Sequence, residues 1–150
     1  MTIYLDVCCL NRPFDDQSQN RVRLEAEAVL TILEMAAAGK LKLTSSDIID
    51  DELFQMPDDE RREKIALLLG ASSKHVALTT AIEHRATEFH KWNISPLDAL
   101  HLAAAEAARA DYFLTTDDYF LRRAHRHADA LKVKVENPAK WLIQEATDEN

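Results

Sequence analysis

Apolar and polar residues alternate along this chain with two different periods, which together predict strands that alternate with helices. Short stretches of apolar and β-branched residues predict five strands, at residues 2–7, 41–44, 75–78, 112–114 and 131–135. Between them, apolar positions at helical spacing predict helices that begin near residues 21, 46, 58, 80, 96, 117 and 138. Residues 8–20 contain Asn11 and Pro13 among polar residues and are predicted to form a loop.

This order of elements is typical of an α/β fold with a central parallel sheet and helices on both of its faces. The 150 residues contain no internal repeat or linker, so we expect one domain over residues 1–150, with a frayed tail from about residue 146. In such a sheet, ligands bind outside the carboxyl ends of the strands. Residues that follow the predicted strands are therefore the first candidates for a functional site.

Composition and charge exclude several classes of protein. No apolar stretch approaches the roughly 20 residues of a membrane span, and the N-terminus lacks a signal-peptide pattern, so we expect a soluble, cytoplasmic protein. The formal net charge of -8 argues against broad non-specific binding of nucleic acid, although not against a local basic groove. The chain has no glycine-rich phosphate-binding loop, and its adjacent Cys8 and Cys9 suit neither a disulfide framework nor a zinc site.

Four acidic residues are placed at the predicted sheet edge. Asp6 lies near the end of the first predicted strand, Asp117 follows the strand at residues 112–114, and Asp98 lies in the first turn of a helix. Glu52 lies within an amphipathic helix and could lie beside its buried face. Each residue alone has an ordinary explanation, namely capping or helix-dipole interactions for Asp98 and Asp117 and a solvated position for Glu52.

As a set, the four carboxylates would require a cation. Two like charges about 4 Å apart repel by roughly 4 kcal/mol at an effective dielectric of 20, so several carboxylates in one pocket must either bind protons or hold a metal ion. Oxygen ligands suit Mg²⁺ or Mn²⁺. Such an ion activates a water molecule and stabilises an in-line displacement at phosphorus.

Several segments resemble the PIN domain, the fold of many small metal-dependent ribonucleases that include the VapC-type toxins of toxin–antitoxin pairs. The matching segments are YLD at residues 4–6, SDIIDDEL at 46–53, LDALHLAAA at 97–105, FLTTDD at 113–118 and VENP at 135–138. The LDALHLA and LTTD segments are specific in this order and spacing, whereas the other segments are weak when taken singly.

The resemblance implies an endoribonuclease with an acidic site for Mg²⁺ or Mn²⁺. The catalytic residues and metal ligands would be Asp6, Glu52, Asp98 and Asp117. Asp118 would supplement Asp117 or replace it, and Thr116 resembles a hydroxyl residue that often lies beside the metal. Many family members carry a hydroxyl or amide residue just after the first aspartate; here Val7 and two cysteines follow, and Asn11 would supply such a group.

The resemblance further implies three partners: an RNA substrate, a small antitoxin that covers the acids, and a second copy of the chain in a homodimer. Arg12, Arg122 and Arg123 would contact RNA phosphates, although for the last two a charge complement to the helix dipole is an equal alternative. His101 lies one helical turn after Asp98. It would support the site or contact the substrate, but a buried, satisfied helix residue is the favoured interpretation.

Two other classes of function are weaker. A cysteine phosphatase needs a phosphate-cradling loop, but no glycine follows Cys8 and Arg12 is only four residues away. A haloacid-dehalogenase-like phosphatase would have a second aspartate in place of Cys8. A non-catalytic PIN-like module that binds RNA or protein is the remaining alternative; loss of one acid would be its signature, and all four acids are present.

Overall fold

Five parallel strands form one sheet in the computed structural model, which describes residues 1–148. In the order in which they lie side by side, the strands are β3 (Lys74–Val76), β2 (Lys42–Ser46), β1 (Thr2–Leu5), β4 (Tyr112–Leu114) and β5 (Lys134–Glu136). The central strand β1 pairs with β2 on one side and with β4 on the other, with Tyr4 opposite Thr44 and Phe113. The predicted parallel sheet is confirmed, and the carboxyl ends of its strands point to one edge.

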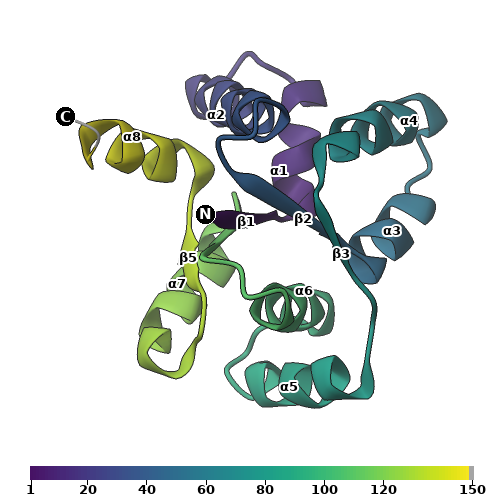
Figure 1. Cartoon of the computed structure of the whole chain (residues 1–150), viewed down its shortest axis with the longest axis vertical. Coiled ribbons are helices and arrows are strands. Elements are labelled where there is room, and N and C mark those ends of the chain that lie inside the picture. The colour runs from purple at the N-terminus through teal and green to yellow at the C-terminus, as the bar shows by residue number, and fades with distance from the viewer. Residues whose placement is uncertain (149–150) are drawn as a thin grey trace.

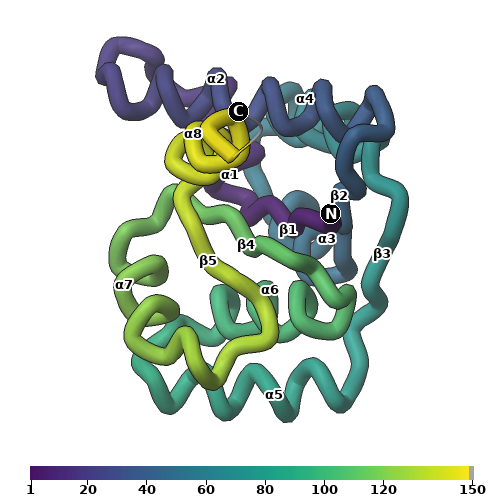
Figure 2. Tube along the Cα trace, turned by 60° about the vertical axis from the view of Figure 1, so that its left-hand side comes forward, coloured from purple at the N-terminus to yellow at the C-terminus, as the bar shows by residue number. Residues whose placement is uncertain are grey.

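Helices cover both faces of this sheet. They are α1 (Val7–Asn11), α2 (Asn20–Ala37), α3 (Asp47–Phe54), α4 (Asp59–Leu68), α5 (Thr80–His90), α6 (Pro96–Ala107), α7 (Asp118–Arg126) and α8 (Pro138–Asp148). Figures 1 and 2 show α2 and α8 together on one side of the sheet and the antiparallel pair α5 and α6 on the other. Within residues 1–148, no helix combines the length and the apolar character that are needed to cross a bilayer.

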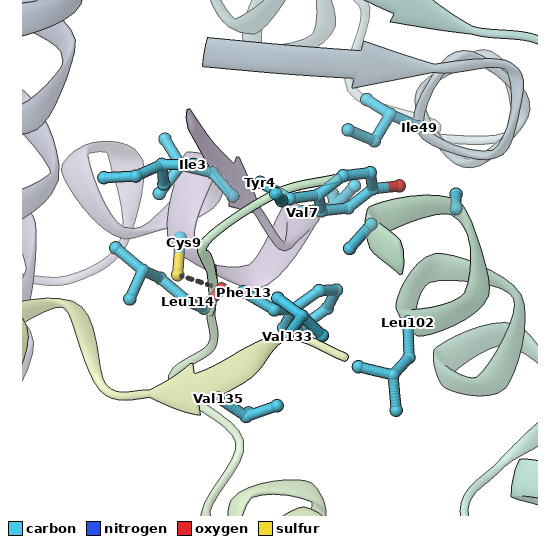
Figure 3. Close-up of a cluster of buried hydrophobic side chains, with 14 of the residues drawn as sticks. Ile3, Tyr4, Val7, Cys9, Ile49, Leu102, Phe113, Leu114, Val133 and Val135 are labelled. Atoms are coloured by element: carbon cyan, nitrogen blue, oxygen red, sulfur yellow. Dashed lines mark hydrogen bonds between the residues drawn. The ribbon is translucent and has the colours of Figure 1, made fainter. Parts of the chain in front are cut away.

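The sheet core joins the central strands to helix α7 through stacked aromatic rings. Tyr4 stacks on Phe113 with ring centroids 5.2 Å apart, and Phe113 stacks on Phe120 at 5.3 Å. All three side chains are fully buried, and each contributes about 1.5–3 kcal/mol through the apolar surface that it removes from water. Figure 3 shows the Tyr4 hydroxyl pointing out of this apolar cluster, towards the helices that carry Ile49 and Leu102.

The chain turns directly from β1 into a short helix, where the sequence had predicted a longer strand and then a loop. The prediction of a strand through residue 7 is therefore wrong, and the predicted loop over residues 8–20 is confirmed only at residues 15–19: α1 begins at Val7, and a 3₁₀ turn follows at Arg12–Phe14. The Asp6 carboxylate accepts a hydrogen bond from the Val7 N–H and caps α1, while Cys9 and Leu10 are buried. One helical turn is too short to show a clear apolar period, and Pro13 made this segment look irregular.

At the other end of the chain, α8 begins at Pro138 as predicted and is helical through Asp148. The tail predicted from about residue 146 thus overlaps the last turn of this helix, and its final residues, 149–150, lie outside the described residues. Trp141 anchors α8 because its side chain is 1% exposed.

A buried carboxylate, that of Glu25 on α2, ties together three separate parts of the fold. It accepts hydrogen bonds from Arg12 Nε at 2.9 Å, from Arg21 Nε at 3.2 Å and from Asn137 Nδ2 at 2.6 Å. Glu25 is only 1% exposed, so its charge depends on these donors for compensation. Arg21 continues the network to α7 through two hydrogen bonds to the Asp118 carboxylate, at 2.6 and 2.7 Å.

Replacing Glu25 with alanine is expected to lower the free energy of unfolding by about 2–4 kcal/mol, because Arg12, Arg21 and Asn137 lose a shared acceptor. Urea denaturation followed by circular dichroism measures this loss. The control is Glu27→Ala on the exposed side of the same helix, which should change stability by less than about 0.5 kcal/mol. Similar losses in the two variants would contradict a central role for Glu25.

Candidate functional site

The Asp6 carboxylate lies at the carboxyl end of the central strand, and the residue is only 5% exposed. Its Oδ1 accepts a hydrogen bond from the Val7 N–H at 2.8 Å. Its Oδ2 accepts hydrogen bonds from the Thr115 hydroxyl at 2.9 Å and from the Cys8 thiol at 3.2 Å. These donors hold the carboxylate in place, and none of them is a basic side chain.

Thr115 links Asp6 to Asp117 at the end of β4. While its hydroxyl donates to Asp6, the same oxygen accepts a hydrogen bond from the Asp117 N–H at 3.1 Å. Asp117 also caps α7, because its Oδ1 accepts a hydrogen bond from the Phe120 N–H, as the sequence suggested. The sequence had pointed to Thr116 as the hydroxyl beside the acids, whereas in the structure the hydroxyl that bonds Asp6 is that of Thr115.

Asp98 lies in the first turn of α6, behind the Ser95 cap, and faces the same edge of the sheet. It lines an open pocket of about 550 Å³ together with Asp117 and the aromatic residue Phe120. Burial raises the pKa of Asp98; the Ser95 hydroxyl opposes this shift and the Asp117 carboxylate adds to it. Burial also raises the pKa of Asp6 well above its usual range, and Cys8 and Asp98 raise it further.

Asp6, Asp98 and Asp117 are also alike in their charged neighbours. Among residues 1–148, no lysine, arginine or histidine nitrogen lies within 4.0 Å of the carboxylates of Asp6, Asp98 or Asp117. By contrast, the buried Glu25 has two arginine partners. The site therefore gathers negative charge that the described part of the protein does not neutralise.

Glu52, the fourth predicted acid, reaches this region from α3 and is tied to α6. Its Oε1 lies 2.9 Å from His101 Nε2, and the Tyr4 hydroxyl lies 2.7 Å from His101 Nδ1 and 2.7 Å from Ser46 Oγ. His101, Tyr4 and Ser46 are completely buried. The histidine is thus a satisfied buried residue, and at the same time it contacts a predicted site residue.

The remaining predicted residues lie on either side of the acids. Asp118 is exposed and paired with Arg21, which lowers the pKa of its carboxyl. On the same helix Arg122 is exposed, and the Arg123 guanidinium lies over the Tyr119 ring, 4.7 Å from its centroid. Their side of the site is therefore rich in basic groups, only part of which are engaged.

On the opposite side, Asn11 and Arg12 line a pocket of about 470 Å³ that also includes Cys8 and Arg61. Arg12 donates to Glu25 and Asp15, so it is not free. Arg61 donates to Asp15 at 3.0 Å and to Asn11 Oδ1 at 3.4 Å. Sequence reasoning missed Arg61, because an arginine in the first turns of a charged helix looks like a solvated surface residue.

A separate group of ligand atoms lies at the start of α3. Side-chain atoms of Asp47, Asp50 and His75 all lie within 4.8 Å of one another, so this group could hold a metal ion. His75 Nε2 lies 2.7 Å from Asp47 Oδ1, and its Nδ1 lies 2.8 Å from Ser45 Oγ. Any measurement of metal binding must therefore distinguish this cluster from the three aspartates.

The donor set around Asp6 fits a hard divalent cation. Carboxylate oxygens are the ligands that Mg²⁺ prefers, and this ion keeps several of its waters when it binds protein. Within the described residues, no three of the four predicted acids form a group as tight as the one at the start of α3. An ion there would thus be held by a few carboxylates directly and by others through water.

Replacing Asp6 with asparagine is expected to stabilise the metal-free protein at pH 7, and to do so more than at pH 4. Because Asp6 has a raised pKa in the folded protein, the folded state binds more protons than the unfolded chain, and stability falls as pH rises above roughly 4. The variant removes this loss. Its advantage should disappear near pH 4, where both forms are uncharged.

Thermal denaturation in EDTA at both pH values measures this difference, with the exposed Asp129→Asn as the control that should behave as wild type. An Asp6→Asn variant that is less stable than wild type at pH 7 would show that the donors to Asp6 fully compensate the buried charge.

Comparison with solved structures finds the same fold in toxin–antitoxin complexes. A chain in the crystal structure of VapBC2 from Rickettsia felis bound to a DNA fragment from their promoter superposes with a TM-score of 0.61 at 15% identity, covering 91% of this chain and 98% of that chain. A chain in the 2.2 Å resolution structure of VapBC-1 from nontypeable Haemophilus influenzae gives a TM-score of 0.57 at 13% identity, covering 92% and 98%. At this identity the likeness concerns the fold.

A search of curated proteins finds no match. Comparison with protein families finds one that covers β1 to α7 and therefore contains Asp6, Glu52, Asp98 and Asp117. The family is the PIN domain, and it matches residues 3–126. The chain thus belongs to the PIN domain family.

Proposed function

We propose that this protein is an endoribonuclease that uses Mg²⁺ or Mn²⁺ to hydrolyse RNA phosphodiester bonds. The observation that carries the proposal is the gathering of Asp6, Asp98 and Asp117 at the carboxyl edge of the sheet without a basic partner. Burial, together with nearby negative charge, raises the pKa values of Asp6 and Asp98, and a divalent cation would stabilise their ionised forms. Membership in the PIN domain family, whose members are typically nucleases, supports this function.

Each residue of the site has a part in this chemistry. When bound, the divalent cation supplies an activated water and offsets charge on the phosphorus in the transition state. Asp6, Asp98 and Asp117 would hold the cation, and Thr115 orients Asp6 through its hydroxyl. Glu52 would hold a water ligand of the cation from the side of α3. Asp118 is paired with Arg21, so it would bind the cation only if that ion pair opens.

Basic groups on both sides of the acids would position the RNA backbone. Arg12 and Arg61 line the pocket on the α1 side with Asn11, and Arg122 and Arg123 lie on α7. Arginine binds phosphate through two parallel hydrogen bonds. Basic side chains beside the acidic site are compatible with an overall net charge of -8, because a phosphate group interacts mainly with the charges close to it. Thr116 would add a contact with the RNA beside the acidic residues.

We further propose that the protein is the toxin of a type II toxin–antitoxin pair and acts in the cytoplasm. The support is the shared fold with chains of VapBC complexes, over nearly the full length of those chains. A small antitoxin would cover the acids, and two copies of the chain would form a homodimer.

Cleavage of a panel of structured RNAs by the purified protein tests the enzymatic proposal. Cleavage is expected with Mg²⁺ or Mn²⁺ and not with EDTA. Asp6→Asn and Asp98→Asn are each expected to reduce the rate by at least about a hundredfold, because several kcal/mol of transition-state stabilisation is lost with the cation. The double variant Asp47→Asn with His75→Gln is the matched control, since it removes the other possible metal cluster and should cleave as wild type does.

Cleavage that survives EDTA or both aspartate substitutions would refute the metal site. If no RNA in the panel is cut, thermal denaturation with and without Mn²⁺ decides the matter. A metal-dependent rise in melting temperature that requires Asp6 would indicate a narrow substrate range, and its absence would favour a non-catalytic binding module.

A further inference from the structure

A chain of buried hydrogen bonds starts and ends on helix α3. Ser46 caps this helix, because its Oγ accepts a hydrogen bond from the Ile49 N–H at 3.1 Å. The Ser46 oxygen also lies 2.7 Å from the Tyr4 hydroxyl, which in turn lies 2.7 Å from His101 Nδ1. His101 Nε2 then lies 2.9 Å from Glu52 Oε1, two turns along the same helix α3 from its cap.

This set of residues, Ser46, Tyr4, His101 and Glu52, is here named the Tyr4 relay. Its members come from β2, β1, α6 and α3, and the first three are 0% exposed. Burial raises the pKa of the Tyr4 phenol, so Tyr4 keeps its single proton and can donate to only one of its two neighbours. The direction of the relay is therefore decided by which neighbour receives that proton.

Only one direction satisfies every buried group with a neutral histidine and an ionised Glu52. Ser46 already accepts the Ile49 N–H, so its own hydroxyl proton is free to be donated to Tyr4. Tyr4 then donates to His101 Nδ1, and the imidazole proton on Nε2 is donated to Glu52. Each oxygen and nitrogen along the relay thus has a complementary partner, as buried polar groups require.

The reverse direction is costly. If Tyr4 donated to Ser46, His101 would have to donate from Nδ1, and a neutral imidazole would turn the lone pair of Nε2 towards a carboxylate oxygen 2.9 Å away. That contact would be acceptable only with a second proton, either on the ring or on Glu52. The Ser46 hydroxyl proton would also lose Tyr4 as its acceptor, and the hydrogen bonds of residues 1–148 show no other for it.

We propose that His101 is a positioning residue for Glu52, held by Tyr4 as a neutral imidazole with its proton on Nε2. Its consequence for metal binding rests on the proposed function: His101 engages Oε1 of Glu52, and the hydrogen bonds of residues 1–148 leave Oε2 available to a cation or its water. A histidine fixed in this way donates a hydrogen bond to the carboxylate and limits its rotation. The relay would therefore set the orientation of the one predicted ligand that α3 carries.

The first test is the tautomer of His101 in the wild-type protein, read from the ¹⁵N and ¹H chemical shifts of a histidine-labelled sample at neutral pH without metal. The expected spectrum has a protonated Nε2 and an unprotonated Nδ1. A proton on Nδ1 alone, or on both nitrogens, would overturn the proposal. This measurement requires no substitution in the core and no nuclease activity.

The second test compares two substitutions of similar polarity for Mn²⁺ affinity, measured by electron paramagnetic resonance in the Asp47→Asn, His75→Gln background. In His101→Gln, the terminal amide nitrogen reaches the position of Nε2 and keeps a donor for Glu52. In His101→Asn, the side chain stops near Nδ1 and does not reach Glu52. We expect about a 10–100-fold loss of affinity in His101→Asn, and a loss of less than about threefold in His101→Gln.

Equal losses in the two variants, at matched folded fractions by circular dichroism, would refute positioning of Glu52. Asp6→Asn in the same background separates the two proposals. If Asp6→Asn leaves Mn²⁺ affinity unchanged, the proposed metal site is wrong whatever His101 does. If Asp6→Asn abolishes Mn²⁺ binding while both His101 variants bind as wild type does, only the positioning role is wrong.

Discussion

Burial of the Asp6 carboxylate at the end of the central strand costs free energy that its donors recover only in part. The neighbouring elements are connected through the hydrogen bonds that this carboxylate accepts. Asp6 caps α1, so the chain must turn sharply at residue 7, and the hydroxyl of Thr115 both donates to Asp6 and fixes the main chain at Asp117. The hydrogen bonds that begin α1 and fix the main chain before α7 therefore position both Asp6 and Asp117.

The protein treats its carboxylates in two ways. Glu25, Asp118 and Asp15 are bound by arginines, and the pairs of Asp118 and Asp15 join elements that are distant in sequence. Within residues 1–148, the acids around Asp6 have no basic partner, although Arg12 and Arg61 line the neighbouring pocket and α7 carries Arg122 and Arg123. Since arginines are available nearby, the missing partners are a property of the site, and an exchangeable cation is the natural complement to it.

Much of the architecture could be predicted from sequence. The spacing of apolar residues shows which side of each helix or strand is buried, and the carboxyl ends of parallel strands lie at one edge of the sheet. Asp6 and Asp117 were proposed as site residues for the same reason, because each comes just after a strand. The relay through Tyr4 was not predicted, since a tyrosine in an apolar strand looks like an ordinary core residue. The bonds from Tyr4 to His101 and from His101 to Glu52 also join residues that are far apart in the sequence. The hydrogen bond from Thr115 to Asp6 could not be foreseen either, because the apolar period does not show which of the two threonines after the strand turns towards the acid.

The family match ends at residue 126, but the fold continues beyond it. Strand β5 pairs with β4, and the Glu136 carbonyl accepts the main-chain N–H of Thr115, the residue whose side chain holds Asp6. From the same region Asn137 reaches Glu25, and Trp141 fills the core beside α2. The segment that matches the family is thus shorter than the segment that folds as one unit. A cut or fusion joint placed at residue 126 would expose β4 as an edge strand and loosen Thr115, so it would damage the acidic site without touching any residue of the site itself.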